Sequence, residues 1–295
     1  ASLDAVQGAP LRVLRATRSR LTSIAGLAGS PLHEADLGQT PLEDLGPLAS
    51  SRVSALKLSG TRVQDLSPLA GVPLTRLAID ATRVSDLAPL AGMPLRQLQL
   101  ALCQVADLKP LKGMALSELD LTGLPVADLG PLAGMPLTTL NLTGTAITDL
   151  APLRRLRLTS LALVDTKVSD LRPLAGLPLT SLDLTRTPVT DLAPLATCPL
   201  QSLVIDGIPA DDLRPLAKTP LKDLRMLAAR ATDLAPLAET PLERLVFTPG
   251  PGIAGLRELR TMPSLRQIGT AWDGSWLRVP QARDFWQRLD AREKR

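Results

Sequence analysis

The sequence predicts an α/β solenoid, with a curved parallel sheet on its concave side and short helical or 3₁₀ turns on its convex side. The first observation is a strict period. An apolar residue recurs every 21 residues from Leu11 to Leu242, and the next equivalent, Leu265, follows after 23. The second is composition, because 45% of the 295 residues are hydrophobic but only 2% are aromatic. A compact domain normally fills its core with bulky rings, whereas aliphatic residues suit a thin stack of repeats.

Each 21-residue unit is expected to begin with a short strand. In the unit that starts at Leu74, residues 76–80 alternate, so that Leu77 and Ile79 face inward and Arg76, Ala78 and Asp80 face outward. Strands of successive units should stack as a parallel sheet. The return segments then cover its buried face.

An aspartate followed by Leu-x-Pro-Leu opens each return segment. It occupies position 13 of ten units, at Asp44, Asp65, Asp86, Asp107, Asp128, Asp149, Asp170, Asp191, Asp212 and Asp233. An aspartate there can cap the free N–H groups of a helical or 3₁₀ turn, and proline is tolerated in the first turn. The alternative is a cation-binding ladder, but calcium-binding repeats use a Gly/Asp-rich nonapeptide. Capping is therefore the favoured interpretation.

Position 9 carries a second recurring polar residue. It is threonine in Thr40, Thr61, Thr82, Thr145, Thr166 and Thr187, while Cys103, Leu124, Ile208 and Ala229 fill other units. A threonine hydroxyl can satisfy one backbone group. The apolar substitutes predict a less continuous polar ladder. Gly at position 19 and Pro at position 21 are expected to end each turn.

The apolar positions 1, 4, 6, 11, 14 and 17 resemble the leucine-rich repeat, LxxLxLxx(N/C)xL, in its short bacterial form. The Asp-Leu-x-Pro-Leu segment is similar to that of internalins. The resemblance covers nearly the whole chain and implies a leucine-rich-repeat solenoid that serves in protein interaction. Position 9 departs from the family, which normally has Asn there.

Residues 1–10 align with the end of a unit, with Ser2 at the cap position, Leu3 at 14, Val6 at 17 and Gly8 at 19. The chain is therefore expected to begin inside a repeat, and further sequence is expected to precede it. We divide the chain into an array of 21-residue units over 1–241, of which 1–10 is a partial unit, and a divergent C-terminal capping unit over 242–295.

The capping unit carries all the aromatic residues, namely Phe247, Trp272, Trp276, Phe285 and Trp286. Along the capping unit, a strand-like segment is followed by a helix-like segment, a second strand-like segment and a charged amphipathic tail. F-T-P at 247–249, M-P-S-L-R-Q-I-G at 262–269 and A-R-D-F-W-Q-R-L-D at 282–290 resemble the closing unit of bacterial repeat proteins often joined to serine/threonine kinase domains. We expect the rings to plug the last repeat.

The sequence shows no catalytic, cofactor or metal constellation, and we predict that the protein is not an enzyme. His33 is the single histidine and is expected at the surface. Cys103 and Cys198 lie four units apart, about 19 Å at strand spacing, too far for a disulfide. Free thiols favour a cytoplasmic location. G-P-G-I-A-G at 250–255 formally matches a dinucleotide fingerprint, but no doubly wound sheet accompanies it, so a turn into a helix is favoured.

The outward strand positions form a candidate binding wall with charged ends, a small polar middle and no aromatic residue. The candidate partner-binding residues are Arg76, Asp120, Asn141, Asp183, Arg225 and Arg244 on the wall and Trp276 and Trp286 in the capping unit. We expect a non-catalytic protein–protein interaction or scaffold module with an unidentified protein partner. The alternative is a regulatory or targeting domain of a larger enzyme, such as a bacterial serine/threonine kinase, whose catalytic domain is not in this chain. A net charge of only +4 and an interrupted column of basic residues disfavour a nucleic acid as the ligand. No apolar stretch is long enough to predict membrane insertion.

Overall fold

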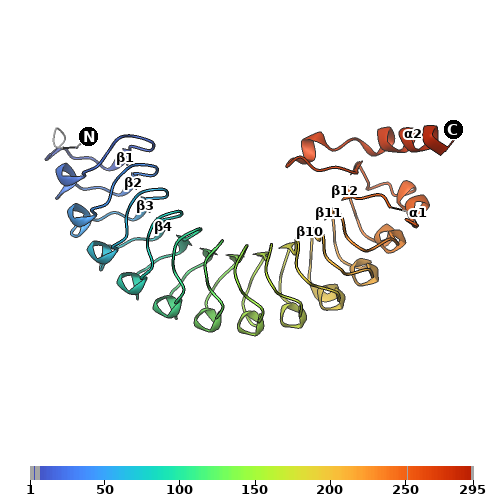
Figure 1. Cartoon of the computed structure of the whole chain (residues 1–295), viewed down its shortest axis with the longest axis horizontal. Coiled ribbons are helices and arrows are strands. Elements are labelled where there is room, and N and C mark those ends of the chain that lie inside the picture. The colour runs from blue at the N-terminus through green and yellow to red at the C-terminus, as the bar shows by residue number, and fades with distance from the viewer. Residues whose placement is uncertain (1–2, 4–6, 251, 294–295) are drawn as a thin grey trace. The chain divides into compact units, whose positions relative to one another are not determined.

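The computed structural model describes residues 3, 7–250 and 252–293 and contains two compact units, residues 1–147 and 148–295. Each unit is a stack of repeats with strands along one side and 3₁₀ turns along the other (Figure 1). This is the solenoid that the period predicts and that the resemblance to the leucine-rich repeat implies. No helix among the described residues is long and apolar enough to span a bilayer.

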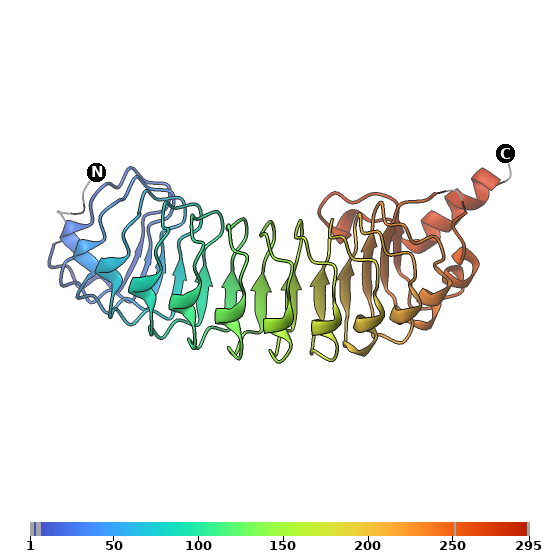
Figure 2. The ribbon, with the colours of Figure 1, turned by 60° about the horizontal axis from the view of Figure 1, so that its bottom comes forward.

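Among its described residues, unit 1 contains seven short strands. They pair in parallel and in chain order, and Figure 2 shows them side by side. They are β1 (Val13–Arg15), β2 (Glu34–Asp36), β3 (Ala55–Lys57), β4 (Arg76–Ala78), β5 (Gln97–Gln99), β6 (Glu118–Asp120) and β7 (Thr139–Asn141). The 3₁₀ turns are η2 (Ala25–Leu27), η3 (Gly46–Leu48), η4 (Ser67–Leu69), η5 (Ala88–Leu90), η6 (Lys109–Leu111) and η7 (Gly130–Leu132).

The described residues of unit 2 continue the same pattern and add two α-helices. Its strands are β8 (Ser160–Ala162), β9 (Ser181–Asp183), β10 (Ser202–Val204), β11 (Asp223–Met226), β12 (Arg244–Phe247) and β13 (Gln267–Gly269). Its helices are η8 (Ala151–Leu153), η9 (Arg172–Leu174), η10 (Ala193–Thr197), η11 (Arg214–Leu216), η12 (Ala235–Glu239), α1 (Leu256–Arg260), η13 (Trp276–Arg278) and α2 (Ala282–Glu293).

The core of each unit consists of aliphatic columns, because equivalent residues of successive repeats lie in register. In β3, β4 and β5, for example, Leu56 pairs with Leu77 and Leu77 with Leu98. The six apolar positions of the repeat that begins at Leu74 are buried, each 2% exposed or less, at Leu74, Leu77, Ile79, Val84, Leu87 and Leu90. The sequence therefore identified the inward face correctly.

The position-13 aspartates cap the turns as predicted. In all ten, Oδ1 accepts a hydrogen bond of 2.7–2.9 Å from the backbone N–H two residues later, which is the first residue of the 3₁₀ turn. The carboxylate thus satisfies a donor that has no partner inside so short a helix. Capping accounts for the whole column without a metal ion.

The threonines at position 9 are buried, and each hydroxyl donates to the carbonyl three residues earlier at 2.7 Å. Cys103, at the same position, instead donates its thiol to the Ile79 carbonyl of the preceding repeat at 3.0 Å. The ladder therefore changes its bonding pattern where threonine is absent, as the substitutions predict.

The N-terminal partial unit is described only in part. Ser2 and Val6 lie outside the described residues, while Gly8 has a φ of +78°, similar to Gly29 and Gly71 at position 19 of later units. This left-handed glycine agrees with the alignment of residues 1–10 on the end of a repeat.

At the other end, the chain closes its own sheet edge. The Ile268 N–H of β13 donates to the Pro280 carbonyl at 3.1 Å, and the Ala282 N–H donates to the Arg266 carbonyl at 2.7 Å.

The glycine-rich turn precedes α1 as predicted, although its Pro251 lies outside the described residues. A Cβ on Gly255 would lie 2.1 Å from the Ala235 nitrogen, so close packing against η12 requires glycine there.

Candidate protein-binding surface

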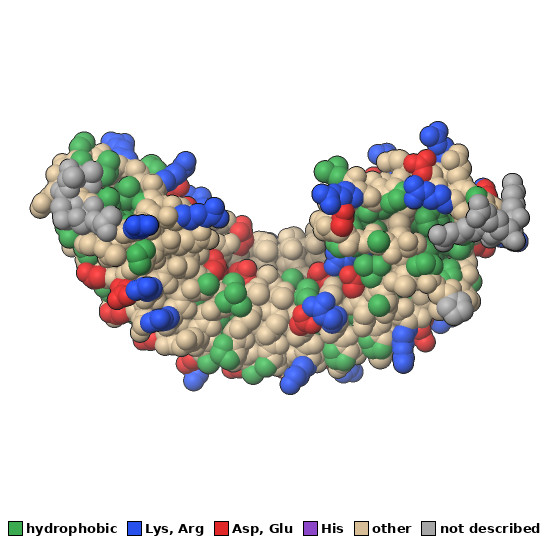
Figure 3. All heavy atoms as spheres, turned by 45° about the horizontal axis from the view of Figure 1, so that its top comes forward, with side chains coloured by type: hydrophobic (Ala, Val, Ile, Leu, Met, Phe, Trp, Pro, Cys, Tyr) green, Lys and Arg blue, Asp and Glu red, His purple; other side chains and the backbone are tan. Residues whose placement is uncertain are grey.

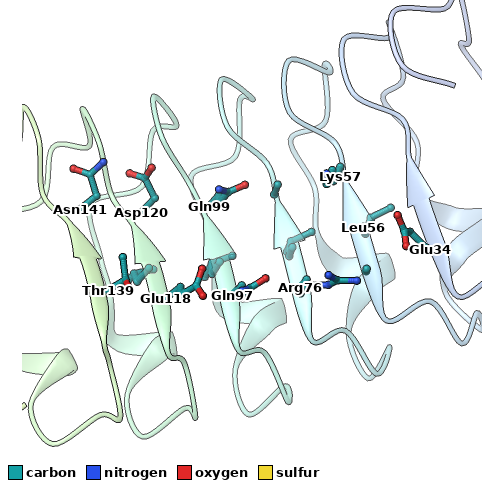
Figure 4. Close-up of a pocket in the computed structure, with 15 residues that line it drawn as sticks. Glu34, Leu56, Lys57, Arg76, Gln97, Gln99, Glu118, Asp120, Thr139 and Asn141 are labelled. Carbon is teal, nitrogen blue, oxygen red and sulfur yellow. The ribbon is translucent and has the colours of Figure 1, made fainter. Parts of the chain in front are cut away.

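A groove of about 470 Å³ lies on the exposed face of the unit 1 sheet and extends from β2 to β7 (Figure 4). Its floor is low at Ala55 and Ala78, each 7% exposed, because neighbouring strands carry longer side chains at the equivalent positions. Parallel strands in strict register hold the lining residues on a rigid surface. The groove was not predicted, since its depth depends on how small and large side chains alternate between repeats.

Opposite charges occupy different parts of this groove. Lys57 and Arg76 lie on β3 and β4, whereas Glu118 and Asp120 lie on β6, with glutamines on β5 between them (Figure 4). Lys57, Arg76 and Glu118 are exposed, and none of them forms an ion pair with another described residue. The groove therefore presents charged groups that are available to a ligand.

The predicted site residues Asp120, Asn141 and Asp183 share a local structural role at the ends of their strands. Asp120 accepts hydrogen bonds from the Thr122 N–H at 2.9 Å and from its hydroxyl at 2.6 Å. Asn141 accepts from the Thr143 N–H at 3.0 Å, and Asp183 makes the same pair of contacts as Asp120, with Thr185. These side chains hold the turn that follows the strand. Asp120 and Asn141 also line the groove with Arg76.

Unit 2 carries a different arrangement, in which arginines on the sheet face are paired with aspartates. Arg225 of β11 forms an ion pair with Asp206 at 2.6 Å, and Arg244 of β12 forms one with Asp223. The contact with Asp223 raises the pKa of the Arg244 guanidinium. Both predicted arginines therefore have carboxylate partners within the fold.

Two tryptophans cover these arginines. The Arg225 guanidinium lies 5.1 Å from the Trp272 ring centroid, and that of Arg244 lies 5.0 Å from the Trp276 centroid. The two indole rings are 4.9 Å apart, edge to face. The expectation that no aromatic residue lines the wall was wrong in unit 2, because the segment after β13 folds back over β11 and β12. Sequence spacing could not reveal this return.

An exposed apolar tip follows the tryptophans. Leu277 is 94% exposed, and its N–H is held by the Ser275 hydroxyl oxygen at 3.1 Å. Figure 3 shows hydrophobic side chains beside basic and acidic ones over this C-terminal part of unit 2. Leu277 was missed at the sequence level, where one leucine among many carries no signal.

Trp286 has a packing role in the structure. It is 8% exposed, its ring meets Phe285 edge to face at 5.0 Å, and Arg260 lies 6.0 Å from its centroid. Phe285 in turn contacts Phe247 of β12 at 6.2 Å. The rings thus fill the end of the last repeats, which leaves little of Trp286 exposed to a partner.

Among the described residues, the remaining reactive groups do not form a site. Burial raises the pKa of both the Cys103 and Cys198 thiols, and both cysteines are free. His33 is exposed. Among the described residues, no group of three or more His, Cys, Asp or Glu side chains could hold a metal ion.

Comparison with solved structures identifies the fold. An internalin, InlF, from Listeria monocytogenes matches with a TM-score of 0.73 and 24% identity, over 85% of this chain and 78% of that chain. A leucine-rich-repeat protein of Leptospira interrogans matches with a TM-score of 0.71 and 18% identity, over 85% and 70% of the two chains. A chain of the LRIM1/APL1C complex matches at 0.50 and 14% identity, over 92% and 66%. No protein-family model matches the sequence, and no curated protein is a significant match.

Proposed function

Because this chain has the leucine-rich-repeat fold of the bacterial internalins, we propose that it is a non-catalytic module that binds a protein partner through the groove of unit 1. One observation carries the proposal. Arg76, Lys57 and Glu118 are exposed in the groove and form no ion pair with another described residue. Arg225 and Arg244 on the sheet of unit 2, by contrast, are already paired with aspartates.

Charged groups on a rigid surface suit recognition of a protein. Complementary charges speed association and exclude wrong partners, and charge-assisted hydrogen bonds form when the groups become desolvated. The strands fix the positions of these side chains before a partner arrives, so little ordering of the backbone opposes binding. The structural similarity to a chain of the LRIM1/APL1C complex supports a protein as the partner.

Regulation or targeting of a larger enzyme, including a serine/threonine kinase, stays a prediction from the sequence resemblance. It would require the same property, a surface that selects a protein. Both functions therefore depend on protein binding by the groove, which is the property to measure.

The test is quantitative affinity capture from a native lysate with the full chain as bait. Arg76→Glu is expected to reduce the captured partner about tenfold, because it places a like charge opposite the partner's complementary group. Arg83→Glu is the matched control, since Arg83 belongs to the same repeat and is exposed, but does not line the groove. A partner retained equally by Arg76→Glu and wild type, but lost with Trp276→Ala or Arg225→Glu, would contradict the groove and place binding on unit 2.

A further inference from the structure

We propose that the ligand of the unit 1 groove is an extended polypeptide segment with an acidic and a basic side chain on the same face, about four residues apart. This inference rests on the proposed function, that the groove binds a protein. It adds which chemistry the groove selects and that the segment crosses the strands.

The charges of the groove fall in two rows that cross the strands. In one row, Arg76 of β4 is in register with Gln97 of β5, and Gln97 with Glu118 of β6. In the other, Lys57 of β3 is in register with Ala78, then Gln99, then Asp120. From its cation to its anion, each row thus crosses a glutamine, as Figure 4 shows. The first row also continues past Arg76 through Ala55 to Glu34 of β2, so Arg76 has a carboxylate two strands away on either side.

The separation of the charges sets the spacing of the ligand. Neighbouring strands are about 4.8 Å apart, so two steps from Arg76 to Glu118 cover about 10 Å and three steps from Lys57 to Asp120 about 14 Å. An extended segment advances about 3.3 Å per residue, which places the same-face residues i and i+4 about 13 Å apart. The same two residues on an α-helix are separated by only about 6 Å along the axis. Residues i and i+4 of an extended segment therefore match the Lys57–Asp120 row to about 1 Å, and flexible side chains must cover a difference of about 3 Å in the Arg76–Glu118 row.

The middle of the groove suits the backbone of such a segment. An extended chain that crosses the sheet face has N–H and C=O groups without intrachain partners, and these require hydrogen bonds when they are covered. Gln97 and Gln99 line the groove between the charged ends, and each amide offers donors and an acceptor. Ala55 and Ala78 leave the space in which the ligand's side chains can lie.

The same charges oppose a nucleic acid. Glu34, Glu118 and Asp120 line the groove with Lys57 and Arg76, so a continuous phosphate backbone would approach carboxylates as closely as cations. Phosphate binding favours an unbroken basic surface. A ligand with both signs of charge satisfies both ends.

The test is selection of a displayed library of random peptides, about 12 residues long, on the full wild-type chain. Enriched peptides are expected to carry an acidic and a basic residue four positions apart, the spacing that keeps both on one face. A synthetic peptide of the best sequence should bind about tenfold more weakly to Arg76→Glu and to Glu118→Lys. The double variant Arg76→Glu/Glu118→Lys should recover part of the binding, because a segment lying in the opposite direction then meets complementary charges at these two positions, while Lys57 and Asp120 keep their charges. Arg83→Glu is the control and should bind as wild type does.

Filling the groove separates this inference from the proposed function. Ala78→Leu adds bulk without charge, and Ala55→Leu is a second such variant in case the first disturbs folding. Peptides lost with both variants but unchanged by Arg76→Glu and Glu118→Lys would overturn the charge inference while the groove remains a binding site. Peptides that bind both filled variants undiminished would contradict groove and charge inference alike. Enrichment of purely acidic peptides, or of no peptide, would also overturn the inference.

Discussion

Position 8 of each repeat of the array, two or three residues after the strand ends, holds its residue in the left-handed region of φ and ψ. The non-glycine residues there are Arg18, Gln39, Ala81, Leu102, Asp165, Arg186 and Ala228, with φ between 50° and 59°. Their backbone N–H groups point to the next repeat: that of Ala81, for example, donates to the Ala101 carbonyl at 2.7 Å. The inter-repeat hydrogen bond thus requires a conformation that L-residues adopt at a cost of about 1 kcal/mol.

Replacing Ala81 by glycine is therefore expected to raise the free energy of unfolding by up to about 1 kcal/mol, because glycine adopts this conformation without strain. The matched reverse change is Gly144→Ala. Its φ is 69° and its new Cβ would meet Gly123 only at ordinary contact distance, 3.7 Å, so strain alone should destabilise it. Urea titration measures both. An Ala81→Gly variant that unfolds at lower urea than wild type would contradict the strain account.

Arginines two residues after a capping aspartate strengthen the carboxylate form of the cap. The side chain of Arg172 donates to Asp170, and this contact, with the Arg172 N–H, lowers the pKa of the Asp170 carboxyl to about 2. Since the folded-state pKa lies below the ordinary value near 3.9, the contribution to stability is present above that value and is lost as pH falls toward 2.

Arg172→Gln should accordingly raise the pKa of Asp170 toward its ordinary value, which NMR titration of side-chain carboxyl carbons can measure. Asp212 is the internal control, because its pKa is lowered by the separate contact with Arg214. An unchanged Asp170 pKa in the variant would show that the guanidinium is not the cause.

The structural element that recurs along the chain is a strand followed by an aspartate-capped 3₁₀ turn. Such a turn has three residues in most repeats, too few to satisfy its own N–H groups. The aspartate and the buried apolar positions before and after it therefore stabilise the turn from outside. This explains why the motif recurs intact while the exposed positions vary freely.

Asp149 tests this element, since its Oδ1 accepts from the Ala151 N–H at 2.8 Å and Ala151 offers no side-chain donor. Asp149→Ala should lower the free energy of unfolding by about 1 kcal/mol, whereas Asp149→Asn, which keeps the acceptor oxygen, should lose less than half of that. Equal losses in the two variants, measured by urea titration, would mean that charge rather than capping matters.

In the molecule as a whole, each repeat buries its apolar faces against its neighbours in sequence, so the last repeat must be covered by something else. In unit 2, the chain after β13 closes the sheet edge, and Phe247, Phe285 and Trp286 pack together behind it. Trp276 lies on the opposite, exposed side, over Arg244. One segment thus both seals the solenoid and places aromatic rings on its outer face.

These two roles predict different consequences for two tryptophans. Trp286→Ala should lower stability by about 3 kcal/mol, because it empties a buried ring site, and should speed hydrogen exchange in β12 and β13. Trp276→Ala removes a half-exposed ring and should change stability much less. Thermal unfolding and hydrogen exchange measure both effects. A larger loss of stability with Trp276→Ala than with Trp286→Ala would contradict the assignment of Trp286 to packing and of Trp276 to the exposed surface.

Among the candidate site residues, the sequence predicted which would face outward but not which would meet. The 21-residue period places Arg76, Asp120 and Asn141 on the outward face, and the structure brings them into one groove. Lys57, Gln97, Gln99 and Glu118 occupy the same repeat positions but were not singled out. Comparing the residues at positions 3 and 5 of successive repeats could have identified them.

The amino-acid sequence by itself determined the repeat, the strand positions, the buried face and the aspartate caps. Each of these depends on residues close in the chain or exactly one period apart, where hydrophobic spacing and capping act locally. The tertiary structure alone decided that Trp272 and Trp276 cover Arg225 and Arg244, because that contact depends on the path of an irregular segment. It also decided that Ala55 and Ala78 form the floor of a charged groove, since depth arises from side-chain sizes on several strands at once.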